Sequence, residues 1–212
     1  MDGPAVSRVA AAINAGPVWP GTAGFSAVRP YEPSMSDDGA SERARRSFEE
    51  HDAFLADDGA YRVETTAFDG RVEIGIEEGD EDRDGRSLRY RLVVRAPTLS
   101  AATEESIGPN LEEGWFETYE RRLEDAPGAV RDDVELEELT VHTGGGEAVA
   151  EFTFTLGDVD RAPAVAKAVT EYAEGTYVEG IVPGFTYRPP VSDLLGRARE
   201  AGEGEGTGPM PL

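Results

Sequence analysis

The chain has 212 residues, and 43 aspartates and glutamates outnumber 20 lysines and arginines, so the formal net charge is −23. The absence of cysteine excludes disulfides, thiolate nucleophiles and cysteine-held zinc or iron–sulfur centres. No apolar run approaches the roughly 18 residues of a membrane-spanning helix. The acidic balance weighs against nucleic acid and membranes as partners, because both recruit cationic surfaces.

The residue types that carry the charge, and their distribution along the chain, are as informative as the net charge. Lys167 is the only lysine, and the acidic residues are spread along the chain rather than gathered in one tail. At ~1 M salt the Debye length falls to ~3 Å, and even a charge density this high then causes little self-repulsion. We therefore expect a cytoplasmic protein of a salt-accumulating cell. The alternative is an ordinary acidic protein encoded by a GC-rich genome.

Composition divides the chain into three parts. Residues 1–34 contain two acidic residues, two arginines and five prolines, and so contribute nothing to the net charge. We expect them to be disordered or to be translated upstream sequence, with Met35 as the true start; a targeting segment is the alternative. Residues 35–200 are predicted to form a single domain. Residues 201–212 are rich in Gly and Glu, which predicts a disordered tail.

Hydrophobic periodicity predicts the first elements of the domain. Ala44, Phe48, His51 and Leu55 recur at helical spacing, which predicts an amphipathic helix that continues as far as Leu55. Alternating apolar and polar residues predict strands over 61–66, 72–77 and 88–95. We expect a tight turn at 68–70, Phe-Asp-Gly, between the first two strands.

The second half continues with another helix and a hairpin. Leu111, Trp115, Tyr119 and Leu123 are spaced by four, which predicts a helix from about Pro109 to residue 126. Strands are expected over 134–141 and 150–156, joined by a glycine loop, with a bulge near Glu137–Glu138 restoring the alternation. A third helix is predicted from a cap at Asp160 to Gly180, and a short helix after Ser192.

The expected element order is therefore α-β-β-β-α-β-β-α. It predicts a two-layer α+β domain, with a five-stranded antiparallel sheet and helices on one face. This order resembles that of type III secretion chaperones over about residues 41–182. The stretches ARRSFEEHDAF, TTAFDGRV, EGWFETYERRLED and YVEGIVPGFTYRPP resemble a haloarchaeal family of small proteins without assigned function, over most of residues 35–192. That family has no assigned catalytic residues, so none can be carried over to this chain.

Asp80, Asp82 and Asp84 begin a DxDxDG pattern, which is how a calcium loop starts. The twelfth position, where such a loop needs glutamate, is Arg91, and the flanks are predicted strands. We therefore favour an acidic hairpin loop over a cation site. The two histidines, His51 and His142, form no HExxH pattern, so no metal site is predicted from them.

Two features are candidates for an interaction surface. Arg89, Arg91 and Arg95 share one face of a predicted strand; they form either a cationic strip for an acidic peptide or phosphate, or cross-strand pairs with Glu73 and Glu77, which we favour. The second feature is an apolar edge predicted from one aromatic helix residue and the Gly/Pro-punctuated segment near the C-terminus. Its members are Phe116, Ile181, Phe185 and Tyr187.

The absence of a catalytic constellation favours a non-catalytic interaction module, chaperone-like or adaptor-like, that binds a protein partner or forms a homodimer. No cofactor is predicted. The alternatives are a small-ligand or metal-binding protein with a pocket between sheet and helices, or a small enzyme whose titratable groups converge only in the fold.

Overall fold

The computed structural model describes residues 37–76, 88–130, 134 and 136–204. In chain order the elements are α1 (Asp37–Glu49), β1 (Phe54–Asp57), β2 (Ala60–Val63), β3 (Asp69–Ile76), β4 (Leu88–Pro97), α2 (Leu99–Ala102), α3 (Pro109–Leu123), the 3₁₀ turn η1 (Ala126–Ala129), β5 (Leu136–Gly144), β6 (Glu147–Leu156), the 3₁₀ turn η2 (Val159–Arg161), α4 (Ala162–Glu179) and α5 (Val191–Gly204).

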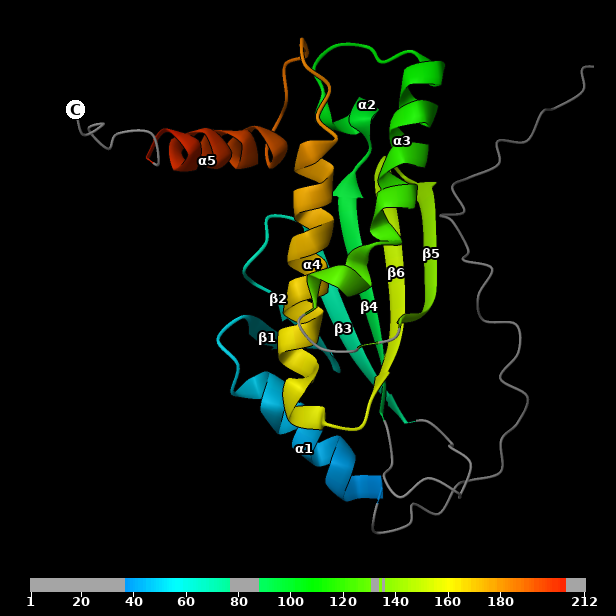
Figure 1. Cartoon of the computed structure of the whole chain (residues 1–212), viewed down its shortest axis with the longest axis vertical. Coiled ribbons are helices and arrows are strands. Elements are labelled where there is room, and N and C mark those ends of the chain that lie inside the picture. Colours follow the sequence, from blue (N-terminus) through cyan, green and yellow to red (C-terminus); the bar gives the residue numbers. More distant parts are fainter. Residues whose placement is uncertain (1–36, 77–87, 131–133, 135, 205–212) are drawn as a thin grey trace, which may run out of the picture. The chain divides into compact units, whose positions relative to one another are not determined.

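The strands form one antiparallel sheet in the order β1-β2-β3-β4-β6-β5, and α1, α3 and α4 cover one of its faces (Figure 1). The predicted α+β class and antiparallel sheet are confirmed. Alternation decides which side chains face the helices: Tyr90 pairs with Phe154 and Leu92 with Phe152, and all four are fully buried. Each such burial contributes ~1.5–3 kcal/mol, so β4 and β6 hold the centre of the core.

The prediction of five strands is wrong, because the described sheet has six. The expected helix through Leu55 ends at Glu49, and Leu55 lies in β1 with half of its surface exposed. Asp58 and Gly59 both have positive φ, 45° and 80°, and connect β1 to β2. Two residues with positive φ form the turn that matches the twist of a β-hairpin, and Asp-Gly is a favoured sequence for it.

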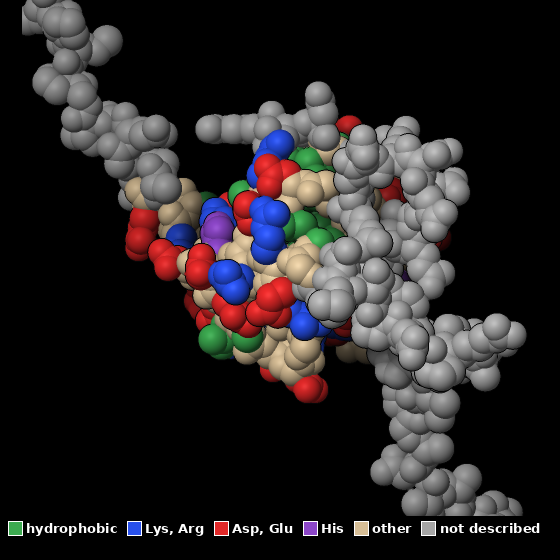
Figure 2. Space-filling model, turned by 90° about the horizontal axis from the view of Figure 1, so that it is seen from below, with side chains coloured by type: hydrophobic (Ala, Val, Ile, Leu, Met, Phe, Trp, Pro, Cys, Tyr) green, Lys and Arg blue, Asp and Glu red, His purple; other side chains and the backbone are tan. Residues whose placement is uncertain are grey.

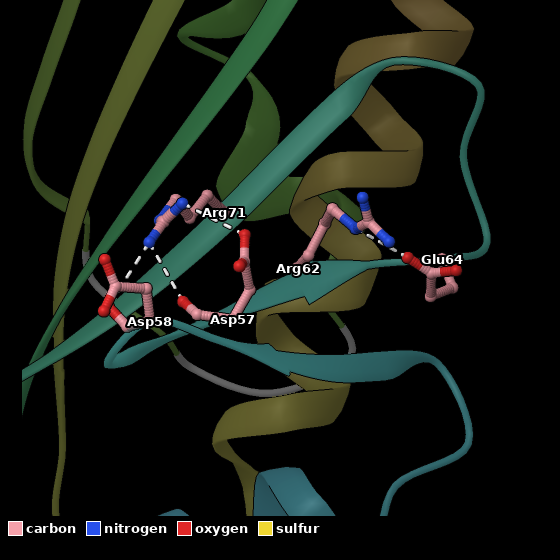
Figure 3. A network of polar contacts seen from close by, with 5 residues as sticks. All are labelled: Asp57, Asp58, Arg62, Glu64 and Arg71. Atoms are coloured by element: carbon pink, nitrogen blue, oxygen red, sulfur yellow. Dashed lines mark hydrogen bonds and ion pairs between the residues drawn. The ribbon is translucent and has the colours of Figure 1, made fainter.

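An arginine of the next strand secures this hairpin (Figure 3). Arg71 of β3 pairs with the Asp57 carboxylate at 3.2 Å and donates to the Asp57 carbonyl at 2.9 Å. On β2, Arg62 pairs with Glu64 at 2.8 Å. The Arg71 contacts tie the β1–β2 turn to the body of the sheet.

The predicted turn at residues 68–70 is also wrong, because Asp69 and Gly70 are the first residues of β3. The connection from β2 instead uses residues 64–68, and Glu174 of α4 accepts hydrogen bonds from the amides of Ala67 and Phe68. These bonds hold α4 close over the start of β3. A Cβ on Gly70 would lie 2.8 Å from the Thr170 methyl carbon of α4, so glycine serves close packing here rather than a turn.

Other boundaries follow the predictions more closely. The bulge is confirmed between Leu136 and Glu138, and the glycine loop turns at Gly145–Gly146, both with positive φ. α4 ends at Gly180 as predicted, but Asp158 rather than Asp160 provides a cap, to the η2 turn that precedes α4.

The order of elements differs from the predicted one by the additional strand β1 and by α2, which Thr98 caps. The topological resemblance to secretion chaperones rested on the predicted order and is not supported by the observed one. The expected short C-terminal helix, α5, runs to Gly204 and so enters the predicted tail. The expectations for residues 1–34 and 205–212 lie outside the described residues.

Candidate functional site

A groove lies between α3 and the end of α4. One wall is a single stripe of α3, at helical spacing of four, three and four: Leu111, Trp115, Thr118 and Arg122. The opposite wall comes from Thr176 and Gly180 of the α4 end and from Val182 beyond it. The groove has a volume of about 240 Å³. Leu111 lies at its margin. Among the described residues, Leu111 and Leu55 are the two large hydrophobic side chains that are exposed.

Two aromatic rings, Trp115 and Tyr119, line this groove, and Tyr177 packs against both of them. Trp115 stacks on Tyr119 with ring centroids 5.6 Å apart, and Tyr177 of α4 meets Trp115 edge-on at 5.3 Å. All three rings are buried. Burial raises the pKa of the Tyr177 and Tyr119 phenols, so both remain neutral hydroxyls at any physiological pH. These aromatic rings are therefore uncharged.

Gly180 brings the α4 end close to the tryptophan. It caps the helix, and its amide donates to the carbonyls of Thr176 at 3.1 Å and Tyr177 at 3.0 Å. A Cβ at this position would lie 3.3 Å from the Tyr177 carbonyl and 3.5 Å from the Trp115 Nε1. A larger residue would crowd the cap and the indole edge, so glycine sets the width of the groove at this end.

Arg122 supplies the polar feature of the groove. Its Nη1 is buried and has no hydrogen-bond acceptor within the described part of the chain, although Glu179 Oε2 lies 3.9 Å away. Its carbonyl accepts from the Tyr172 hydroxyl at 2.9 Å, which joins the end of α3 to α4. The Arg122 side chain is 43% accessible although its Nη1 is covered, so an incoming acceptor would reach this donor only if the guanidinium turned.

The segment that carries Val182 is held against the loop after α2. Thr103 and Tyr187 form an antiparallel bridge, and the Glu104 amide donates to the Thr186 carbonyl at 2.9 Å. The Tyr187 hydroxyl both donates to the Val182 carbonyl and accepts from the Val182 amide. These contacts fix Val182 at the groove wall.

A carboxylate completes this attachment. Glu105 accepts hydrogen bonds from the Thr186 amide and hydroxyl, both at 2.9 Å, and these bonds lower the pKa of the Glu105 carboxyl. The ionised form of Glu105 therefore favours the docked segment.

The predicted apolar edge is only partly brought together at the groove. Ile181 and Tyr187 pack half-buried against the core, next to the Val182 wall, and Phe185 is half-buried. Phe116 also packs against the core, but it is not among the groove residues, since it lies 100° around the helix from Trp115. The residues that sequence reasoning did not assign to a site are Leu111, Trp115 and Arg122; their common spacing was the available signal.

The arginine strip lies on the sheet face opposite the helices. Arg91 pairs with Glu73 at 3.4 Å, as the cross-strand interpretation expected, and with Glu151 at 2.5 Å. The other two arginines pair with residues on the opposite side of β4, Arg89 with Glu137 at 3.0 Å and Arg95 with Glu147 at 3.9 Å. The other predicted partner, Glu77, lies outside the described residues. The strip thus forms part of an ion-paired layer.

A second, shallower pocket of about 340 Å³ lies beside α1 and is lined by residues of both signs: Arg43, Arg46, Ser47, Glu50, His51 and Asp160. Arg43 pairs with Asp160 at 3.0 Å, and His51 Nδ1 accepts from the Ala53 amide. Figure 2, which views this end of the molecule, shows basic and acidic side chains interleaved. Mixed charge of this kind selects neither an anion nor a cation.

The possible cation loop with Asp80, Asp82 and Asp84 lies outside the described residues. Within the described ranges, no group of three or more histidine and carboxylate side chains is placed to hold a metal ion. Lys167 pairs with Glu171 at 2.6 Å. None of the helices that the structure describes has both the length and the hydropathy needed to cross a membrane.

The fold and the groove together define a small two-layer α+β domain with an apolar helix–helix groove and one polar donor at its wall. Residues 49–197 match the model of a family described as a family of unknown function, DUF5813. The chain belongs to this family. No curated protein and no solved structure matches it.

Proposed function

We propose that this protein is a non-catalytic interaction module, and that its α3–α4 groove accepts one apolar side chain of a partner segment together with a neighbouring backbone carbonyl. The observation that carries the proposal is the coincidence of an apolar groove with a buried donor, Arg122 Nη1, that has no acceptor among the described residues.

The size of the groove supports a single anchoring side chain. A cavity of about 150 Å³ holds one benzene ring, so about 240 Å³ accommodates a Leu or Phe side chain and part of its backbone. The apolar walls stabilise such a side chain by removing it from water. Leu111, exposed at the margin, would be covered by the rest of the segment.

The chemistry of Arg122 supports a neutral acceptor. Glu179 already places a carboxylate 3.9 Å from Nη1, and a second carboxylate beside it would be repelled. A backbone carbonyl accepts the hydrogen bond without adding charge. The groove is thus suited to an extended or turn segment with an apolar residue.

We also propose that the module works in a salt-rich cytoplasm. The support is compositional: a net charge of −23 and a single lysine. The ion pairs that the described residues form are solvent-exposed, with side chains at least about a quarter accessible, so each contributes little by itself.

The test uses Trp115 as a reporter. In a Trp19→Phe background Trp115 is the remaining tryptophan, so its fluorescence reports on the groove. N-acetylphenylalaninamide is the probe, because it carries one apolar ring and amide carbonyls. We expect saturable binding with a Kd on the order of 1 mM, given the ligand efficiency of small molecules.

Two substitutions give the matched comparison. Leu111→Asp places a charge at the groove and is expected to weaken probe binding at least tenfold, whereas Leu55→Asp makes the same change at the other exposed leucine and leaves binding unchanged. Arg122→Gln is expected to weaken the amide probe but not toluene, which has no acceptor. Equal binding by the two aspartate variants, or no saturable signal in molar KCl, would refute the proposal.

A further inference from the structure

β5 forms one edge of the sheet, and within the described residues nothing pairs with its outer side. Its first residues are protected by the bulge at 136–138 and by two glutamates. Residues 139–143, Leu-Thr-Val-His-Thr, carry neither a bulge nor a proline, lysine or carboxylate, which are the usual protections of an edge strand. The opposite edge strand, β1, has only four residues and ends at Asp57.

The register shows which backbone groups of β5 are unpaired. Gly144 pairs with Glu147 across the two-residue turn, and such a turn makes that pair a hydrogen-bonded one. Hydrogen-bonded and non-hydrogen-bonded pairs then alternate along the strands. The N–H and C=O groups of His142 and Thr140 therefore point to β6, and those of Leu139 and Val141 point outward.

This edge also leaves apolar surface incompletely covered. Leu139 and Val141 lie on the helix-covered face, opposite Phe152 and Ala150 of β6. Phe152 and Ala150 are fully buried, whereas Leu139 and Val141 are only partly buried. A further strand beside β5 would remove the remaining apolar surface from water.

We propose that β5 pairs antiparallel with β5 of a second copy of this chain, around a two-fold axis at Thr140. In this register Glu138 lies opposite His142 of the second copy, Leu139 opposite Val141, and Thr140 opposite Thr140. The opposed side chains are complementary: a carboxylate meets an imidazole, and two aliphatic side chains meet each other. The two sheets become one continuous sheet.

The hydrogen-bonding groups agree with the same register. Leu139 and Val141 carry the outward backbone groups, and a two-fold axis at Thr140 places them opposite each other as hydrogen-bonded pairs. Moving the axis to Val141 sets Glu138 against Gly144, and moving it to Leu139 sets Glu138 against Thr140. Only the axis at Thr140 pairs the carboxylate with the histidine, and this self-complementarity selects a second copy over an unrelated strand.

Charge makes this association dependent on salt. Each copy carries a formal charge of −23, and the two repel across a Debye length of ~30 Å at 10 mM salt but only ~3 Å at 1 M. We therefore expect the dimer to be favoured in molar KCl, and the measurements below are made there.

The first test is disulfide cross-linking, for which the cysteine-free chain is well suited. Thr140 of one copy lies opposite Thr140 of the other in a non-hydrogen-bonded pair. The Cα atoms of such a pair are ≈ 4.5 Å apart, a distance that a disulfide spans. Thr140→Cys should cross-link almost completely under mild oxidation. Thr143→Cys is the matched control: it is an exposed threonine of the same strand, but the two copies would lie about 20 Å apart across the axis.

The second test is the oligomeric state of the full chain by light scattering. The native chain should be dimeric at micromolar concentration, and Thr140→Glu, which opposes two carboxylates at the axis, should weaken association at least tenfold. Thr65→Glu adds the same charge at an exposed loop position and should leave the dimer intact. A monomeric native chain at ~100 µM, equal cross-linking at positions 140 and 143, or a dimer unaffected by Thr140→Glu would each overturn the proposal.

Discussion

Gly70 offers a direct test of how α4 packs on the sheet. Gly70→Ala adds a Cβ that would lie 2.8 Å from the Thr170 Cγ2 and 3.0 Å from the Val63 Cγ2. Both neighbours belong to the packed interior, since Thr170 is fully buried and Val63 nearly so. The φ angle of Gly70 is not in the left-handed region, so backbone strain does not enter and the effect is one of packing alone.

The expected magnitude is the difference between two terms. Overpacking a core costs about 1–3 kcal/mol, while replacing glycine by alanine in a strand contributes about 0.5–1 kcal/mol through the unfolded state. We therefore expect the free energy of unfolding to fall by up to about 2.5 kcal/mol. For a chain of this length, that lowers Tm by up to about 10 °C.

Gly75→Ala is the matched control in the same strand. Gly75 faces away from the helices, and a Cβ there would be in ordinary contact, 3.4 Å from the Arg89 carbonyl oxygen. We expect the stability of this variant to be unchanged or slightly higher. Both melting curves are recorded by circular dichroism in the same molar salt.

A second substitution identifies the clash itself. Thr170→Ser removes the methyl carbon nearest to the new Cβ but keeps the hydroxyl that donates to the Ala166 carbonyl at 2.8 Å. Combined with Gly70→Ala it should recover part of the lost stability, which appears as a favourable coupling in a double-mutant cycle. If Gly70→Ala is as stable as Gly75→Ala, the described approach of α4 to β3 is wrong.

Two further predictions concern solution conditions. On dialysis from molar KCl to ~10 mM salt, self-repulsion of the −23 chain should abolish the near-ultraviolet circular dichroism, which should return on adding salt; an unchanged spectrum would refute the salt-adaptation proposal. The lowered pKa of Glu105 means that docking of Thr186 is stabilised above the usual carboxyl pKa and is lost as the pH falls through the lowered one. The Thr186 amide resonance should follow this titration, and Glu105→Gln should abolish the dependence.

The sequence predicts those elements whose periodicity is unambiguous. In β4 and β6 the apolar residues alternate over the whole strand, and Tyr90, Phe152 and Phe154 are buried as the alternation requires. The β1–β2 hairpin was missed because Leu55 continued the spacing of the preceding helix, although Asp58-Gly59 is a strong turn signal. The helical spacing, continued over one extra turn, outweighed this turn signal in the prediction. The hairpin itself depends on the pairing of β1 with β2.

Gly70 illustrates the opposite error. Asp-Gly after a strand predicts a turn from local chemistry alone, but here the glycine is required by a helix a hundred residues further along the chain. The role of Gly70 depends on the distance between α4 and β3, and no local sequence pattern predicts that distance. The groove could not be predicted for the same reason: Trp115 and Gly180 are 65 positions apart, and their proximity results from the packing of α3 on α4.

Ion pairing makes the outer face of the sheet a poor partner surface and leaves the edge and the groove as the better ones. Val93 and Val149 lie on this face, yet only 6% and 3% of their surfaces are exposed, because neighbouring side chains cover them. Arg91 there pairs with two carboxylates, and Arg95 with Glu147. A partner that docked on this face would have to displace or desolvate these pairs. The attraction within a buried ion pair offsets little of the free-energy cost of removing the two charges from water. At the β5 edge, by contrast, an incoming chain would pair with backbone groups that have no partner among the described residues, and in the groove it would cover apolar side chains.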